Sequence, residues 1–209
     1  MKKLLGRIEG VSIWQDDDLR VHYAAKAAID ADGSNSQSGG KAAYMTADRG
    51  LDWLANGGMK WDGSKVVIKN AWAKNIVILG ADGQPRAFPG GVIASKTAWR
   101  NPKKKENDPT AYVESSVVPY AVIPPLIRKK CKGVVLGCLV KMTNARNGKT
   151  VMGVVADIGP GAKIGELSIA AADALGIPSS PKSGGTASRI VLYEMWPGTA
   201  APGYVLIPA

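Results

Sequence analysis

The sequence predicts a mainly β protein that folds as one domain. Short apolar and β-branched runs recur along the chain, and Gly, Pro, Asn and Asp fill the gaps between them. Stretches with a helical spacing of apolar residues are few. The length of 209 residues fits a single all-β domain, and a hydrophobic content of 45% with 21% charged residues is ordinary for a globular protein.

The predicted strands share a high β-branched or apolar content and have turn residues at their ends. They are Ile8–Trp14, Lys65–Lys69, Asn75–Leu79, Tyr112–Ile123, Gly133–Met142, Thr150–Ile158, Arg189–Trp196 and Tyr204–Ile207. Asn147 and Gly148 separate two of these runs, Gly133–Met142 and Thr150–Ile158. Because Asn and Gly tolerate positive φ, this pair predicts a β-hairpin.

The clearest helical pattern covers Leu167–Leu175, where apolar residues are spaced three and four apart. Gly176 is suited to be its C-cap, and Pro178 prevents the helix from continuing. A second helix is predicted over Thr46–Leu54. For Val21–Ala28 the pattern fits a short helix or a strand, and both remain open.

The composition changes between Ser34 and Pro109. The segment Ser34–Gly40 is polar and rich in Gly and Ser, and the residues after it contain four of the six tryptophans, which are Trp53, Trp61, Trp72 and Trp99. We therefore predict that approximately residues 36–110 form an insertion that packs against a β core, within a single domain of residues 1–209.

The net charge of +10 favours an anionic partner such as nucleic acid, membrane headgroups or an acidic polymer. The compact basic run Arg100–Lys105 contains Pro102 and is followed by Asp108 and Pro109, which is typical of a solvated loop, so nucleic-acid binding is not expected. His22 is the only histidine and is far in sequence from Cys131 and Cys138, so no zinc site is expected. The two cysteines are predicted to be buried free thiols, unless they face each other across a hairpin as a disulfide.

Two acidic residues stand at the ends of one tight loop. A predicted strand leads into Asp157, a loop rich in Gly and Pro follows, and Glu166 comes just before the predicted helix. Glycosidases use two carboxyl groups, one to protonate the leaving oxygen and one to activate water or attack carbon. The other interpretation is structural, because Asp often forms turns and Glu complements the dipole at a helix start.

Several segments together resemble the chitosanases of glycoside hydrolase family 75. In that family an Asp and a Glu nine residues apart flank a Gly-rich loop before a Ser-Ile-Ala helix, and Asp157 and Glu166 match in type and spacing. The other similar segments are Ile29–Asn35, Val118–Ile123 and Ser180–Gly185. The resemblance covers roughly Val21–Asn35 and Tyr112–Trp196, and it matches the insertion only weakly.

The resemblance implies a six-stranded double-psi β-barrel with a few short helices, and hydrolysis with inversion that needs no metal or other cofactor. Glu166 is assigned as the general acid and Asp157 as the general base, although the reverse order also fits. The residues implied in substrate binding are Asp30, Asp32, Asn35, Lys163 and Ser168. Considered alone, Asp30 and Asp32 also fit an Asx turn, and their motif lacks the later ligands of a calcium-binding loop.

Three functional hypotheses follow. The resemblance predicts an endo-acting hydrolase of β-1,4 bonds in chitosan. Because chitosan is cationic, a chain of charge +10 repels it unless the cleft is acidic, so the charge favours a peptidoglycan-degrading enzyme such as a phage endolysin or a secreted effector. The hypothesis of another class is a non-catalytic barrel that binds polysaccharide. The tryptophans of the insertion fit sugar subsites or a packed core.

The N-terminal segment begins like a signal peptide but does not continue as one. Met1–Leu5 is followed by Gly6, Arg7 and Glu9, which leave no apolar stretch of sufficient length. No run is apolar and long enough for a membrane-spanning helix. We therefore expect a protein made in the cytoplasm that acts on extracellular or cell-wall polysaccharide after release by another machinery.

Overall fold

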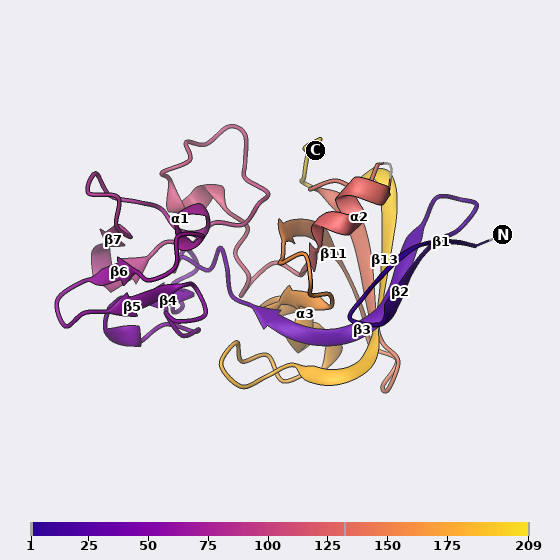
Figure 1. Cartoon of the computed structure of the whole chain (residues 1–209), viewed down its shortest axis with the longest axis horizontal. Coiled ribbons are helices and arrows are strands. Elements are labelled where there is room, and N and C mark those ends of the chain that lie inside the picture. Colours follow the sequence, from indigo (N-terminus) through magenta and orange to yellow (C-terminus); the bar gives the residue numbers. More distant parts are fainter. Residues whose placement is uncertain (1, 132, 209) are drawn as a thin grey trace.

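A closed β-barrel forms the larger part of the computed structural model, which describes residues 2–131 and 133–208. Its six strands are β3 (Val21–Asp30), β9 (Tyr120–Ile123), β10 (Cys138–Asn144), β11 (Thr150–Ile158), β12 (Glu166–Ser168) and β13 (Thr186–Ala200). They lie in the order β3-β12-β9-β11-β10-β13, and β13 pairs again with β3 to close the barrel (Figure 1). The predicted mainly β fold and six-stranded barrel are confirmed.

Two of the strand pairs in the barrel are parallel, β3 with β12 and β9 with β11. The other four pairs are antiparallel. Because most spatial neighbours are not neighbours in sequence, long connections run between the strands. One holds the insertion, between β3 and β9, and two others hold the short helices α2 (Pro125–Lys130) and α3 (Ile169–Leu175).

Alternating burial along the barrel strands explains why these segments are strands. In β10, Cys138, Val140 and Met142 are buried, while the residues between them are partly exposed. Tyr23 of β3 and Tyr193 of β13 pair across the two strands, and their rings stack with 4.9 Å between centroids. These large buried rings remove much apolar surface from water and hold β3 in a fixed position.

An N-terminal hairpin of β1 (Lys3–Ile8) and β2 (Val11–Gln15) extends the sheet beyond β3. The strand predicted over Ile8–Trp14 is confirmed for Val11–Trp14 only, because Ile8 ends β1 and the chain turns at Glu9 and Gly10. Both residues have positive φ, 50° and 71°. The apolar runs on the two sides of so short a turn resemble one continuous strand in the sequence.

The insertion forms a lobe beside the barrel (Figure 1). Its elements are short, and they are β4 (Tyr44–Met45), β5 (Met59–Trp61), β6 (Val66–Ile68), α1 (Ala73–Ile76), β7 (Ala87–Phe88) and β8 (Val92–Ile93). Tyr44, Leu54 and Met59 belong to an apolar cluster of this lobe. Ala31, just after β3, and Ile169 of α3 join the same cluster, so the lobe packs directly on the barrel.

Two local predictions in the insertion are wrong. The helix predicted over Thr46–Leu54 is reduced to one 3-10 turn at its start. Ala47 and Asp48 have φ values of 54° and 57°, in the left-handed region, and this breaks the helical path. The strand predicted over Asn75–Leu79 is replaced by the short helix α1, with only isolated bridges after it.

The helix α3 ends as predicted at Gly176, which adopts a left-handed φ of 66° as C-cap. It begins two residues later than predicted, because Glu166–Ser168 pairs with β3 and β9 as strand β12. The segment Val21–Ala28, for which the sequence leaves helix and strand open, lies within β3. The hairpin predicted at Asn147 and Gly148 is confirmed by the antiparallel pairing of β10 with β11.

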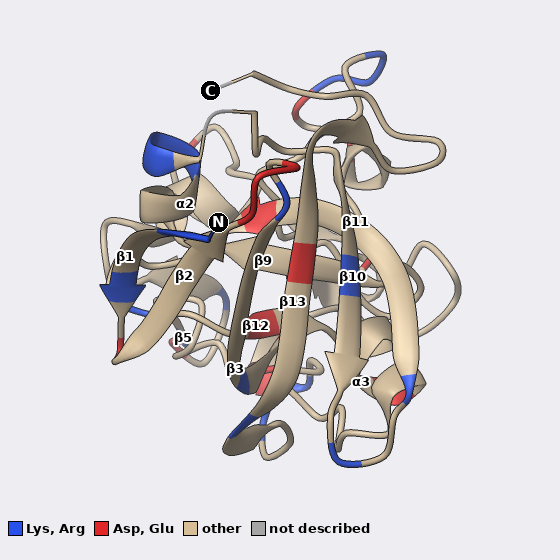
Figure 2. Cartoon of the chain, turned by 90° about the vertical axis from the view of Figure 1, so that its right-hand side faces the viewer, with Lys and Arg blue, Asp and Glu red and all other residues tan. Residues whose placement is uncertain are grey.

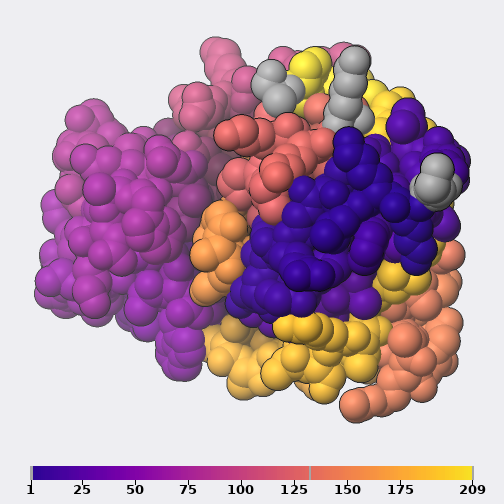
Figure 3. Space-filling view, turned by 45° about the vertical axis from the view of Figure 1, so that its right-hand side comes forward, coloured from indigo at the N-terminus to yellow at the C-terminus, as the bar shows by residue number. Residues whose placement is uncertain are grey.

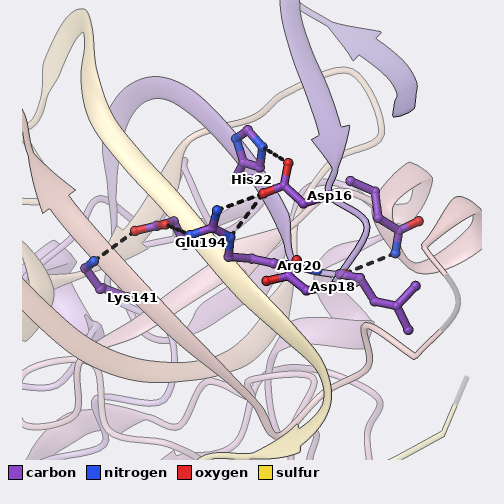
Figure 4. Close-up of polar contacts among 8 residues, drawn as sticks. Asp16, Asp18, Arg20, His22, Lys141 and Glu194 are labelled. Atoms are coloured by element: carbon purple, nitrogen blue, oxygen red, sulfur yellow. Dashed lines mark hydrogen bonds and ion pairs between the residues drawn. The ribbon is translucent and has the colours of Figure 1, made fainter. Parts of the chain in front are cut away.

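A chain of ion pairs links β3, β13 and β10 (Figure 4). Glu194 of β13 is only 6% exposed, and it contacts Arg20 at 2.7 Å and Lys141 at 3.1 Å. Arg20 also contacts Asp16 at 2.8 Å, and the Asp16 carboxylate lies 3.1 Å from His22. The hydrogen bond from Arg20 holds the pKa of Asp16 below its usual range. The only histidine of the chain thus has a structural role.

Replacing Glu194 by Gln (E194Q) is expected to lower the free energy of unfolding by about 1–2 kcal/mol, because Arg20 and Lys141 are 35% and 37% exposed and water screens the charges left behind. The side chain keeps its size, but Arg20 and Lys141 lose a buried counter-charge. Urea unfolding followed by circular dichroism measures the change. The control E106Q removes a carboxylate that is 72% exposed and pairs with Lys96 at 3.3 Å, so it should leave stability nearly unchanged. Equal effects of the two substitutions would contradict the argument from burial.

In Figure 2, a red segment of the β13 ribbon lies beside a blue segment of β10, in agreement with the pairing of Glu194 with Lys141. Cys131 and Cys138 are buried free thiols, which confirms that prediction.

In residues 2–131 and 133–208, every helix is too short or too polar to be a membrane-spanning helix.

Candidate active site

Asp157 and Glu166 lie in one row across three neighbouring strands. Asp157 of β11 pairs with Val122 of β9, and Glu166 of β12 pairs with the same Val122 from the other side. Because adjacent strands are about 4.8 Å apart, the two backbones are roughly 10 Å apart in this row. Residues that pair across strands point to the same face, so both carboxyl groups project from one side of the sheet.

A bulge in β11 sets the direction of Asp157. The register shifts between Val155 and Asp157, so Ala156 has no partner in β9. The Asp157 carboxylate then accepts hydrogen bonds through Oδ1 from the N–H groups of Ala98 and Ile158, both at 2.8 Å. Ala98 belongs to the insertion, so the lobe helps to orient this carboxylate.

A tight glycine loop positions Glu166. Gly165 has a φ of 84°, and a Cβ at this position would overlap the carbonyl oxygen of Lys26, so only glycine fits. Gly159, at the other end of the loop, lies so close that a Cβ there would be 3.1 Å from Oε2 of Glu166. The loop therefore bends the chain from β11 into β12 and leaves space for the Glu166 side chain.

The surroundings of Glu166 favour the protonated form of its carboxyl group. Burial, followed by the charge of Asp30, raises the pKa of Glu166 to about 8, although Lys163 acts in the opposite direction. Lys163 itself is exposed on the loop between Asp157 and Glu166. Among the residues predicted to bind substrate, Lys163 is the one that is exposed to solvent.

Asp30 and Asp32 bring two more carboxyl groups to the site. Carboxyl oxygens of Asp30, Asp32 and Asp157 all lie within 4.8 Å of one another. Oδ1 of Asp30 accepts a hydrogen bond from the N–H of Asp32 at 2.8 Å, which is the expected Asx turn. The turn is thus confirmed, and it is also what brings the two carboxyl groups beside Asp157.

The carboxyl groups of Asp30 and Asp157 lie close enough to affect each other's ionisation, since their oxygens are within 4.8 Å. Burial raises the pKa of Asp30, and burial followed by the Asp30 charge raises the pKa of Asp157 well above its usual range. The two carboxyl groups therefore titrate as a coupled pair.

Asp32 has an unsatisfied acceptor. Its Oδ1 is buried and has no hydrogen-bond partner among the residues that the structure describes. Burial, followed by the charges of Asp30 and Asp157, raises the pKa of Asp32 well above its usual range, while a hydrogen bond with Tyr44 acts in the opposite direction. An unpaired buried acceptor is unfavourable, so a ligand that supplies a donor or a cation would stabilise it.

The insertion contributes a further acidic residue, Asp52, that the sequence analysis missed. Asp52 is 8% exposed, and its Oδ1 accepts hydrogen bonds from the N–H of Trp53 at 2.7 Å and the side-chain amide of Asn56 at 2.8 Å. Burial raises the pKa of Asp52. The charge of Asp52 also raises the pKa of Glu166, although burial and the charge of Asp30 have larger effects. The sequence around Asp52 has no motif that distinguishes it from other loop aspartates.

Asn35 and Ser168, which are predicted to bind substrate, use their polar groups within the scaffold. The side chain of Asn35 is hydrogen-bonded to the backbone oxygen and N–H of Ser95, and the residue is 7% exposed. Ser168 Oγ accepts the N–H of Tyr120 at 2.9 Å and caps α3 by accepting the N–H of Ala171 at 3.1 Å. Both residues thus position the carboxyl groups, and their burial does not favour direct contact with substrate.

The three aspartates could also hold a cation. Asp30, Asp32 and Asp157 each offer one oxygen, and carboxylate oxygens suit hard cations such as Mg²⁺, Ca²⁺ or Mn²⁺. Protons compete with such an ion, because burial raises the pKa of all three carboxyl groups. The metal-free reaction implied by the resemblance therefore stays a prediction.

The site lies where the lobe meets the barrel. In Figure 3, orange surface that follows β11 in the sequence borders the magenta lobe. Asp157 and Glu166 are partly exposed as whole residues, while their carboxyl groups are mostly buried.

Comparison with known proteins does not identify the chain. No protein-family model matches it, and no curated protein matches it at a significant level. The resemblance to family 75 chitosanases therefore remains a prediction, and the function has to be inferred from the site.

Proposed function

We propose that the protein is an endo-acting glycoside hydrolase that cleaves β-1,4 bonds of chitosan with inversion at the anomeric carbon. The observation that supports this most directly is the row in which Asp157 and Glu166 flank Val122 on one face. Inverting glycosidases separate their carboxyl groups by roughly 6.5–9.5 Å to admit a water molecule. Backbones about 10 Å apart are compatible with such a gap.

In this proposal Glu166 is the general acid. A general acid must hold a proton at the working pH, and the pKa of about 8 supports this role for Glu166. Asp157 is the general base in this proposal, because the N–H groups of Ala98 and Ile158 donate to its Oδ1 and favour the ionised form. Water attacks the anomeric carbon, its proton passes to Asp157, and the bond to the leaving oxygen breaks as Glu166 gives that oxygen its proton.

The charge of the site supports a cationic substrate. Although the whole chain carries +10, five carboxyl groups gather at the junction of lobe and barrel, and they are Asp30, Asp32, Asp52, Asp157 and Glu166. A protonated glucosamine unit would relieve their mutual repulsion, whereas an anionic wall polymer would add to it. The local charge at the site therefore favours chitosan as substrate. The net charge of the whole chain, in contrast, favours peptidoglycan.

Incubation with chitosan and, separately, with purified bacterial walls tests the proposal. New reducing ends and glucosamine oligomers, detected by mass spectrometry, are expected from chitosan, together with unchanged turbidity of the walls. Clearing of the walls without products from chitosan would make the enzyme a peptidoglycan hydrolase. Binding to either polymer without any product would replace the hydrolase by a polysaccharide-binding barrel.

A further inference from the structure

A lysine of the barrel rests on an aromatic ring of the lobe. Nζ of Lys182 lies 3.9 Å from the centroid of the Trp53 ring. Trp53 is 46% exposed, so its side chain is otherwise open to solvent. A cation over a Trp face contributes about 0.5–2 kcal/mol, and contacts of this kind recognise ammonium groups in ligands.

Asp52 adds a negative charge beside this ring. Its Oδ1 is held by Trp53 and Asn56, but Oδ2 makes no hydrogen bond within residues 2–131 and 133–208. Burial raises the pKa of Asp52, and the charge of Lys182 lowers it, so the two groups lie within electrostatic reach. The ammonium group of Lys182 thus lies over the face of Trp53 and within electrostatic reach of the Asp52 carboxylate.

The turns that carry these groups have defined conformations. Before Asp52, the two left-handed residues Ala47 and Asp48 form a strained turn, and the Asp48 carboxylate accepts the N–H of Leu54 at 2.7 Å. On the barrel side, Gly185 follows the turn that carries Lys182, and a Cβ there would overlap a backbone oxygen of β3. The strained turn in the lobe is a feature that clusters at binding sites.

We propose that the Trp53 ring and the Asp52 carboxylate form a subsite for the ammonium group of a glucosamine unit, which Lys182 occupies until the sugar displaces it. The side chain of Lys182 and the amino group of protonated glucosamine are both primary ammonium ions. The lysine therefore occupies the subsite with the same chemical group as the sugar. An N-acetylglucosamine unit carries no such charge and gains nothing there. The identity of the sugar rests on the proposed function, but the inference concerns binding and not hydrolysis.

Calorimetric titration with two hexamers, one of glucosamine and one of N-acetylglucosamine, tests the subsite. Titrations use the E166Q variant, in which turnover is expected to be about 10²–10⁴-fold slower. Adding K182A is expected to tighten binding of the glucosamine hexamer by about three- to tenfold, because the internal competitor is gone. Binding of the acetylated hexamer should not change.

Three further variants in the same background complete the test. W53A and D52N are each expected to weaken binding of the glucosamine hexamer, and D52N should remove most of the gain caused by K182A. The control K60A removes an exposed lysine of the same lobe and should leave both affinities unchanged. Circular dichroism checks that each variant is folded.

The outcomes separate the subsite from the proposed reaction. Equal changes for the two hexamers would overturn the subsite, because Lys182 would then act as a steric barrier. Unchanged or weaker binding in K182A would overturn it as well. Selectivity that depends on Lys182, in a protein that cleaves no chitosan, would instead preserve the subsite and reject the hydrolase.

Discussion

Replacement of Glu166 by Gln (E166Q) is expected to lower kcat on chitosan by about 10²–10⁴-fold and to leave KM nearly unchanged. The amide has the size of the carboxylic acid but no proton for the leaving oxygen. In the wild type, kcat should fall as the pH rises through about 8, because Glu166 loses its proton. The residual activity of E166Q should lack this fall. Initial rates of reducing-end formation on both sides of pH 8 measure both effects.

The same substitution is expected to stabilise the fold at alkaline pH. The pKa of Glu166 is raised from 4.5 to about 8 in the folded protein, so the folded state holds the proton more tightly than the unfolded state. The resulting stability is present below pH 4.5 and is lost as the pH rises from 4.5 to about 8. Gln carries no charge and avoids this loss, so E166Q should be more stable than the wild type by about 3 kcal/mol above pH 8.

Urea unfolding of both proteins below pH 4.5 and above pH 8 checks the sign of this effect. The two proteins should differ little in acid and clearly in alkali. The exposed control E106Q should follow the wild type in activity and in stability. If E166Q lost activity and stability together at every pH, Glu166 would serve the fold and the assignment as acid would be wrong.

Local patterns in the sequence account for the parts of the site that are close together along the chain. Asp157 ends a strand and Glu166 follows one short loop later, so one stretch of sequence contains both carboxyl groups and the glycines that bend it. Gly176 likewise ends α3 through its own backbone conformation. In these places, the residues that determine the structure are neighbours in sequence, and prediction succeeds.

Prediction fails where distant segments decide the structure. Glu166–Ser168 becomes a strand only because β3 and β9 flank it, so the predicted helix starts too early. Asp52 enters the site only because the lobe packs against the barrel through Ala31 and Ile169. The scaffold role of Asn35 depends on Ser95, which is 60 residues away.

Replacement of Asp157 by Asn (D157N) is expected to lower kcat by about 10²–10⁴-fold without disturbing the fold. The amide oxygen can still accept the N–H groups of Ala98 and Ile158, which hold this side chain in place. Only the capacity to take a proton from water is lost. The matched control is D62N, because Oδ1 of Asp62 also accepts two backbone N–H groups, at 2.9 and 2.8 Å, in an exposed turn. It should keep full activity.

The stereochemistry of the product then distinguishes a base from a nucleophile at Asp157. Retaining glycosidases hold their carboxyl groups roughly 5–5.5 Å apart and release the β-anomer from a β-bond. Asp157 and Glu166 stand on strands that both neighbour β9 and not each other, so Val122 keeps the wider gap that a water molecule needs. Proton NMR in the first minutes of wild-type hydrolysis should therefore detect the α-anomer. A β-anomer would mean that Asp157 reaches the sugar carbon directly, which this row of three strands opposes.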